Sequence, residues 1–134
     1  MLASSAWRRG FGALADVNVS FDLTCRHTQL SPFAKFLSKH PDIPVIVDHL
    51  GSPVLGDGHV QEVWLDGIQA LAALPNTFMK ISGLSQAGSH WSTSSIRPLV
   101  DQVLGAFGSE RCMLGSNFTV EKLTSSYNAV WMAY

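Results

Sequence analysis

Four short apolar segments, each ending abruptly in polar residues, dominate the pattern of hydrophobic positions along this chain. They cover residues 19–25, 45–48, 77–82 and 111–116. An apolar run of this length that stops at polar groups or glycine is typical of a buried parallel strand with a functional side chain at its C-terminal end. We therefore predict four strands at these positions.

Segments with helical periodicity flank the four predicted strands. Apolar residues recur there at spacings of three and four, and the second helix is expected to begin at Pro32 with Ser31 as its N-cap. The predicted helices cover 4–16, 32–40, 60–71, 96–107 and 123–134. The repeated order of strand and helix predicts an α/β fold with a parallel sheet, in which the chemistry lies at the C-terminal ends of the strands.

Composition narrows the class of protein. The 134 residues are 46% hydrophobic and 14% charged, with a formal net charge of -1, which fits one globular domain. A run of basic residues is absent, so we expect no nucleic-acid or membrane partner, and no apolar run reaches the roughly 20 residues of a membrane span. Cys25 and Cys112 fall in predicted strands, which favours reduced thiols and a cytoplasmic protein.

Alternation of side chains along the second strand gives a specific expectation for its polar end. If His49 faces the catalytic side, Val45 and Val47 face it too, and Asp48 points the other way. We therefore expect Asp48 to brace a neighbouring segment of backbone.

The same reasoning collects polar groups from all four strands at one common rim. The third strand contains Lys80, and a lysine within a strand needs a carboxylate, a ligand or water as its partner. The expected groups are Asp22 or His27, His49, Lys80 with Ser82, and Asn117.

A series of motifs, taken in order, resembles the amidohydrolase-related family, in particular the branch of TIM-barrel hydrolases that includes dicarboxylate and sugar lactonases. The resemblance covers nearly the whole chain. Its motifs are Phe21-Asp-Leu, Val-Asp-His-Leu-Gly-Ser-Pro53 preceded by His-Pro-Asp, Trp64 with Leu71-Ala-Ala-Leu-Pro-Asn76, Met79-Lys-Ile-Ser-Gly-Leu84, and Phe107-Gly-Ser-Glu-Arg-Cys-Met-Leu-Gly-Ser-Asn117.

The resemblance implies a fold and also a missing part. Such enzymes are eight-stranded barrels, usually of about 250 residues, and this chain resembles strands five to eight. We therefore expect a parallel (β/α) half-barrel of the TIM type, with residues 1–134 forming the C-terminal half of a truncated domain. The family's His-x-His pair has no counterpart here, so the chain alone is expected to be inactive.

The resemblance also assigns roles to single residues. His49 matches the family histidine of strand six, which binds a metal or polarises the scissile carbonyl, and it is the best metal candidate. His27 matches another ligand position loosely and equally fits a solvated loop. Asn117 stands where many members have aspartate; an amide cannot take a proton, so it would orient water or bind a carbonyl.

Three further residues are predicted to bind substrate. Lys80 and Ser82 match a Lys-x-Ser-Gly element and would hold a carboxylate or hydroxyl group. Trp91, next to His90, lies in the loop after the third strand and would help to close the pocket.

The resulting hypothesis is that the parent enzyme hydrolyses a small lactone or a related carboxylic ester or amide by attack of water, with one divalent metal (zinc or manganese) or none. Two other classes stay open. The chain could be an inactive remnant that binds a partner or forms a homo-oligomer covering its open sheet edges. It could also be a flavodoxin-like module, although Gly51-Ser-Pro is a poor phosphate loop.

Overall fold

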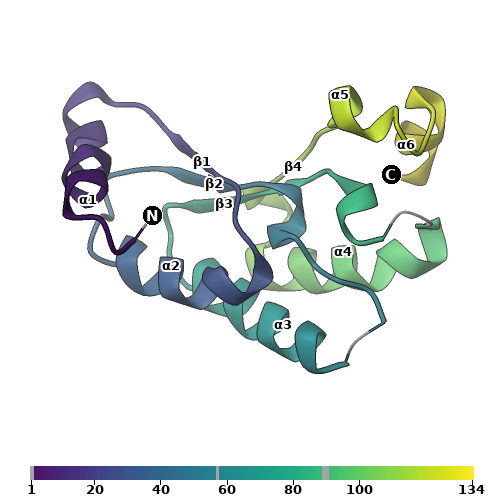
Figure 1. Cartoon of the computed structure of the whole chain (residues 1–134), viewed down its shortest axis with the longest axis horizontal. Coiled ribbons are helices and arrows are strands. Elements are labelled where there is room, and N and C mark those ends of the chain that lie inside the picture. Colours follow the sequence, from purple (N-terminus) through teal and green to yellow (C-terminus); the bar gives the residue numbers. More distant parts are fainter. Residues whose placement is uncertain (1, 57, 89–90) are drawn as a thin grey trace.

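A computed structural model of the chain describes residues 2–56, 58–88 and 91–134. Its centre is a single four-stranded sheet in which every neighbouring pair of strands is parallel (Figure 1). The strands follow the sheet in chain order: β1 (Phe21–Leu23), β2 (Val45–Val47), β3 (Thr77–Ile81) and β4 (Cys112–Leu114). This arrangement confirms the predicted parallel half-barrel, with each strand shorter than the apolar segment that contains it.

Helices connect and follow the strands, as the periodicity predicts. Short 3₁₀ turns complete the connections. The helices are α1 (Ser5–Gly12), α2 (Leu30–Leu37), α3 (Gly58–Ala72), α4 (Thr93–Phe107), α5 (Phe118–Glu121) and α6 (Tyr127–Ala133), and the turns are η1 (Ala13–Val17), η2 (His27–Gln29), η3 (His49–Gly51), η4 (Leu84–Gln86) and η5 (Ser109–Arg111).

Several helix boundaries differ from the prediction, and two of the differences have a clear local cause. Helix α2 begins at Leu30, so Ser31 is not its N-cap, and Pro32 lies within the first turn, where its missing N–H has no intrahelical partner to lose. The helix predicted at 123–134 is the shorter α6, because the Ser126 side chain accepts a hydrogen bond from the Ala129 N–H (3.1 Å) and caps its start. Helix α5 comes before that range and was not predicted.

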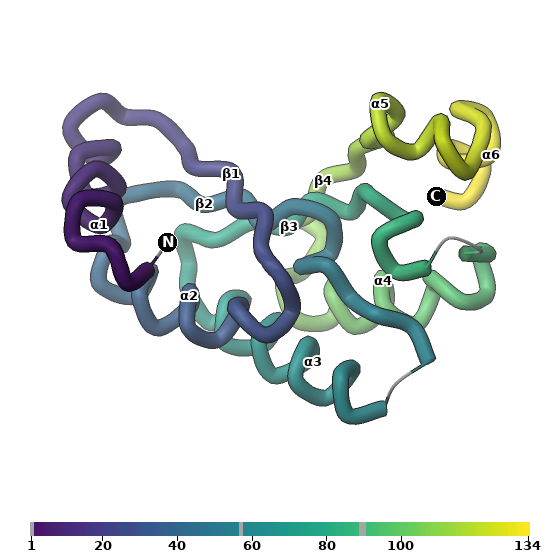
Figure 2. The backbone as a smooth tube through the Cα atoms, viewed as in Figure 1, coloured from purple at the N-terminus to yellow at the C-terminus, as the bar shows by residue number. Residues whose placement is uncertain are grey.

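Helices α2, α3 and α4 lie on one side of the sheet, whereas the opposite side carries no such layer (Figures 1 and 2). The hydrophobic core lies between the sheet and these helices. Its fully buried members include Leu23, Leu30, Val45, Val47, Ile68, Leu71 and Met79. A doubly wound flavodoxin-like fold has helices on both faces of its sheet, so that alternative is wrong.

Gly67 sets the close approach of α2 and α3. A Cβ atom at this position would lie 2.4 Å from the Cβ atom of Leu30, closer than real side chains come. The helix layer therefore packs tightly beneath the sheet, and the strand ends are held in fixed positions.

Among the described helices, none combines the length and apolar character that crossing a bilayer requires. Both cysteines carry free thiols, and burial raises the pKa of the Cys25 thiol to about 11.

Candidate active site

The predicted site residues gather at the rim formed by the C-terminal ends of the strands. His49 follows β2 after Asp48, Ser82 directly follows β3, and Asn117 comes three residues after β4. Since all four strands run in the same direction, these positions share one edge of the sheet.

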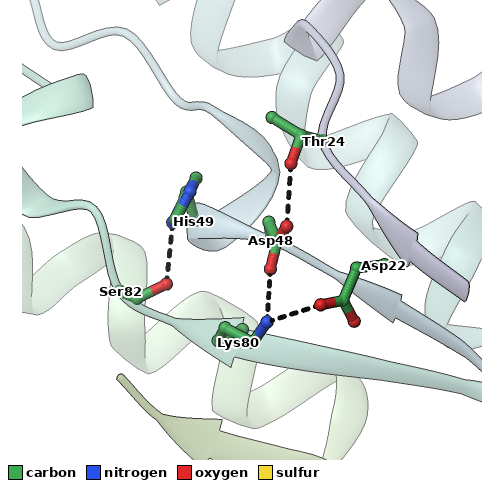
Figure 3. A network of polar contacts seen from close by, with 6 residues as sticks. All are labelled: Asp22, Thr24, Asp48, His49, Lys80 and Ser82. Carbon is green, nitrogen blue, oxygen red and sulfur yellow. Dashed lines mark hydrogen bonds and ion pairs between the residues drawn. The ribbon is translucent and has the colours of Figure 1, made fainter. Parts of the chain in front are cut away.

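His49 and Ser82 are joined directly. The Nδ1 atom of His49 lies 2.8 Å from the Oγ atom of Ser82 (Figure 3). Ser82 is buried, with 1% of its surface exposed, so its hydroxyl has a fixed position. The hydrogen bond leaves Nε2 as the ring nitrogen of His49 that is available for chemistry.

Burial lowers the pKa of His49, and the positive charge of Lys80 lowers it further, against the opposing effects of Asp48 and Glu121. The pKa of this imidazole therefore lies below its ordinary value of 6.5. At neutral pH the ring is uncharged, and it can act as a hydrogen-bond donor or acceptor through Nε2.

The backbone around His49 is strained. Four consecutive residues have positive φ angles: His49 (56°), Leu50 (55°), Gly51 (69°) and Ser52 (54°). Each non-glycine residue in this region costs about 1–2 kcal/mol, so the surrounding structure must hold the turn. Strain of this kind is often found at functional sites.

Trp64 helps to stabilise this strained turn. Its Nε1–H donates a 2.7 Å hydrogen bond to the carbonyl oxygen of Leu50, and both side chains are buried. Trp64 thus combines core packing with a hydrogen bond to the strained turn.

The prediction that Asp48 points away from the site is wrong. Its Oδ1 accepts a 2.7 Å hydrogen bond from the Lys80 ammonium, and its Oδ2 accepts one of 2.7 Å from the Thr24 hydroxyl (Figure 3). The left-handed turn breaks the strand alternation at His49, which is why counting back from His49 fails. Val45 and Val47 lie on the helix-covered face.

Lys80 has two carboxylate partners, Asp48 just after the neighbouring strand β2 and Asp22 on β1, the next strand beyond it. Besides Asp48, its Nζ atom lies 3.2 Å from an oxygen of Asp22 on β1. Burial raises the pKa of Asp48, but the hydrogen bonds from Lys80 and Thr24 and the lysine charge outweigh it, so the net shift is downward. Burial likewise lowers the pKa of Lys80, while its two carboxylate partners more than compensate and raise it.

The internal partners of Lys80 and Ser82 give both side chains a positioning role. Lys80 links β1, β2 and β3, and Ser82 orients the imidazole of His49. Their predicted contacts with substrate stay a prediction.

Asn117 begins α5 with a positive φ angle of 47°. Its side-chain nitrogen Nδ2 is buried and has no hydrogen-bond partner within the part of the chain that the structure describes. An unpaired buried donor is costly, and it indicates that a ligand, a water molecule or another segment accepts this hydrogen bond.

Glu121 is a site-proximal residue that sequence reasoning missed. It is fully buried, and its carboxylate accepts hydrogen bonds from the Ser85 hydroxyl (2.8 Å) and the Ser85 N–H (3.2 and 3.3 Å). Its own N–H donates to the Asn117 carbonyl (2.9 Å). Glu121 thereby ties α5 to the turn η4 that follows Ser82, a contact that neither motif nor periodicity indicates.

The structure says less about the remaining predicted residues, His27, Trp91 and His90. His27 is the first residue of η2, just beyond β1, and is partly exposed. Trp91 is partly buried and packs against the core, so its predicted part in closing the pocket is untested. His90 lies outside the described residues.

The described residues do not make a metal site on their own. Across residues 2–56, 58–88 and 91–134, His, Cys, Asp and Glu side chains form no group of three that could hold an ion. The nearby carboxylates of Asp48 and Asp22 are already bonded to Lys80. A zinc or manganese ion at this rim would therefore need ligands from beyond these residues.

Comparison with known proteins decides the family. A family model described as amidohydrolase matches residues 2–134. The chain belongs to the amidohydrolase family. This confirms the resemblance drawn from the motifs, and nearly every residue takes part in the match.

Curated relatives of this amidohydrolase chain are about twice its length. It is 41% identical to an uncharacterized protein of Sinorhizobium fredii, and the alignment covers 96% of this chain and 43% of that protein. It is 30% identical to an L-fucono-1,5-lactonase of Burkholderia multivorans, with 91% of this chain and 45% of that protein covered. The chain therefore spans about half the length of the curated relatives it matches.

Solved structures agree with this coverage. One match is an amidohydrolase of Burkholderia multivorans with bound zinc, at a TM-score of 0.88 and 29% identity. The superposition covers 98% of this chain and 49% of that chain. Another match is amidohydrolase 2 of Bifidobacterium longum subsp. infantis, at a TM-score of 0.79 and 28% identity. The superposition covers 97% of this chain and 47% of that chain. The neighbours are TIM barrels, so the sheet described above is half of such a barrel.

Proposed function

We propose that this site belongs to a hydrolase that opens a small lactone, with a sugar 1,5-lactone as the leading substrate class. The observation that carries the proposal is the uncharged, half-buried imidazole of His49, oriented by Ser82 at the C-terminal rim of a parallel sheet. The relatives named L-fucono-1,5-lactonase support the substrate class. The alternative of an inactive remnant has no support from the comparisons.

His49 would act as an electrophile. A Ser82 hydroxyl that donates to Nδ1 fixes the tautomer with a proton on Nε2. That N–H would donate to the lactone carbonyl oxygen, and it would stabilise the negative charge that develops there when water attacks the carbonyl carbon. A low pKa suits this role, because the neutral ring keeps a single defined donor.

Asn117 and Lys80 would position the reactants. The unpaired Nδ2 of Asn117 would donate a hydrogen bond to the attacking water or to a substrate oxygen. Lys80 uses two of its three N–H donors on Asp22 and Asp48, which leaves one for a substrate hydroxyl or carboxylate. Neither group can accept a proton from the attacking water. The general base for this step would therefore come from the other half of the barrel.

A chimaera tests this proposal. Residues 2–134 would replace the matching half of the Burkholderia multivorans lactonase, and the hydrolysis of L-fucono-1,5-lactone would be followed by acid release in a pH-stat. We expect measurable activity, and we expect His49→Gln to lower kcat/KM by about 10²-fold or more.

The matched control is His59→Gln, since this histidine is exposed at the start of α3. Its kcat/KM should equal that of the unmodified chimaera. A folded chimaera without activity, or one in which His49→Gln has no effect, would contradict the proposed function.

A further inference from the structure

Helix α5 is held in place by an unusual anchor. It is a single turn, Phe118–Glu121, and its buried side chain is the carboxylate of Glu121. A helix this short is not stable in isolation, so its position depends on the contacts of its side chains. Within the described residues, the side-chain partner of this carboxylate is Ser85. A buried carboxylate contributes little net stability, so its use here points to a requirement for one defined geometry.

The segments that follow β3 and β4 share a backbone contact at the strand ends. The N–H of Gly115 donates to the Ile81 carbonyl oxygen (3.0 Å), and a Cβ atom at Gly115 would lie 3.3 Å from the Cβ atom of Ser82. Further along, the hydrogen bonds that join the two segments in the described part of the chain run from Ser85 to Glu121. The contact between Ser85 and Glu121 therefore sets the spacing of the two segments beyond the sheet.

Each end of this contact is one short turn away from a residue of the site. Ser85 lies in η4, shortly after Ser82, which bonds Nδ1 of His49. Glu121 ends the helix that Asn117 begins, and its N–H donates to the Asn117 carbonyl oxygen (2.9 Å). Asn117 has a left-handed backbone (φ 47°), a conformation that needs support from its surroundings. A continuous series of contacts thus connects the His49 ring with Asn117.

We propose that Glu121 is a positioning residue that fixes the distance between Asn117 and the His49 ring. The proposal rests on the function proposed above, in which Nε2 of His49 and Nδ2 of Asn117 act on the same reaction. Glu121 is fully buried, so it touches no substrate itself. Its effect on the rate is indirect, because a displacement of about 1 Å in one donor can cost about 10²-fold.

Steady-state kinetics of the chimaera described above test this role. Glu121→Ala should lower kcat/KM by about 10-fold or more, because Asn117 loses its fixed position. Glu121→Gln should stay within about 3-fold of the unmodified chimaera, since one glutamine oxygen can accept both hydrogen bonds that Oε1 accepts from Ser85. The matched control, Glu110→Ala, removes an exposed carboxylate from η5 and should leave kcat/KM unchanged.

A double-mutant cycle separates positioning from a general loss of structure. In an Asn117→Ala background, Glu121→Ala should lower kcat/KM by less than about 2-fold, because the group that Glu121 positions is already absent. A merely structural defect would lower it by the same factor in both backgrounds. Ser85→Ala removes the hydroxyl donor but keeps the carboxylate. It is the second variant if Glu121→Ala fails to fold, and its smaller loss should likewise depend on Asn117.

NMR of the 134-residue chain tests the geometry independently of activity. The Cα and Cβ chemical shifts of Asn117 report its left-handed conformation, and they should change in Glu121→Ala but not in Glu110→Ala. Unchanged shifts in Glu121→Ala, or a loss of kcat/KM that is equal with and without Asn117, would overturn the positioning role. An active chimaera that tolerates Glu121→Ala would overturn this role alone. A chimaera in which His49→Gln has no effect would instead contradict the proposed function, and the Asn117 shifts would still decide the geometry.

Discussion

Gly83 lies directly against the imidazole of His49. A Cβ atom at position 83 would stand 2.7 Å from both Cγ and Nδ1 of the ring, and Gly83 itself has a φ angle of +62°. Glycine is thus required twice, for the backbone conformation and for the approach of the ring that bonds Ser82. The glycine of the Lys-x-Ser-Gly motif therefore shapes the site without taking part in its chemistry.

The first prediction concerns that contact. Gly83→Ala should destabilise the protein by about 2 kcal/mol and displace the His49 ring, because the new methyl group overlaps Nδ1 at an unfavourable φ. Urea denaturation measures the first effect, and the imidazole NMR signals of His49 report the second. The matched control is Gly105→Ala in α4, where a Cβ atom meets nothing within 4 Å; it should stabilise by about 0.5–1 kcal/mol. Equal effects of the two substitutions would contradict this account.

The second prediction concerns the strained turn after β2. Trp64→Phe removes the donor that holds the Leu50 carbonyl, so the unfolding free energy should fall by about 1–2 kcal/mol, as measured by chemical denaturation. Trp131→Phe on α6, at a side chain that is 39% exposed, should change it by less than about 0.5 kcal/mol. A turn that tolerates loss of the Trp64 bond would show that packing of Leu50 alone holds it.

The third prediction concerns the pH dependence of stability that the Lys80 network creates. The pKa of Asp48 is lowered in the folded protein. Its contribution to the free energy of unfolding is therefore fully present above the ordinary pKa of 3.8 and is lost as the pH falls through the pKa of the folded protein. The pKa of Lys80 is raised, so its contribution is present below 10.5 and is lost as pH rises through the folded value. Thermal melts across pH should therefore show a decline at each extreme. In Asp48→Asn the acid decline should be shallower; an unchanged profile would rule out this network as its source.

The fourth prediction concerns Glu121, which favours the charged form of His49 and ties α5 to η4. Glu121→Gln should lower the pKa of His49 further below 6.5, as followed by NMR titration of the imidazole, because a negative charge near the ring is lost. Ser85→Ala breaks the hydroxyl bond but keeps the carboxylate charge, and it should shift that pKa less. A larger shift in Ser85→Ala than in Glu121→Gln would point to displaced structure rather than charge.

Periodicity and motif were sufficient for the architecture. Runs such as Val45-Ile-Val and Thr77-Phe-Met-Lys-Ile identify themselves as parallel strands because both their length and their polar C-terminal ends are local properties of the chain. The helix-capping interactions were harder to foresee: the break between α5 and α6 depends on one Ser126 hydrogen bond.

The partners of the site side chains could not be predicted in the same way. Strand alternation failed at Asp48 because four successive left-handed residues follow it, and that conformation is held in part by a hydrogen bond from Trp64 on the next helix, α3. The buried contact of Glu121 with Ser85 joins positions 36 residues apart, and no periodic pattern encodes such a pair.

The sequence by itself determined that the sheet is parallel and that His49, Lys80, Ser82 and Asn117 end at one rim, because strand order and direction follow from the alternation of apolar runs and amphipathic segments. The resemblance of its motifs to the amidohydrolase-related family then implied a (β/α) half-barrel. Only the tertiary structure decided which of these groups meet: His49 with Ser82, and Lys80 with Asp48 and Asp22. Side-chain partners depend on the packing of distant elements and on the left-handed turn at His49, and neither is written in the local pattern of residues.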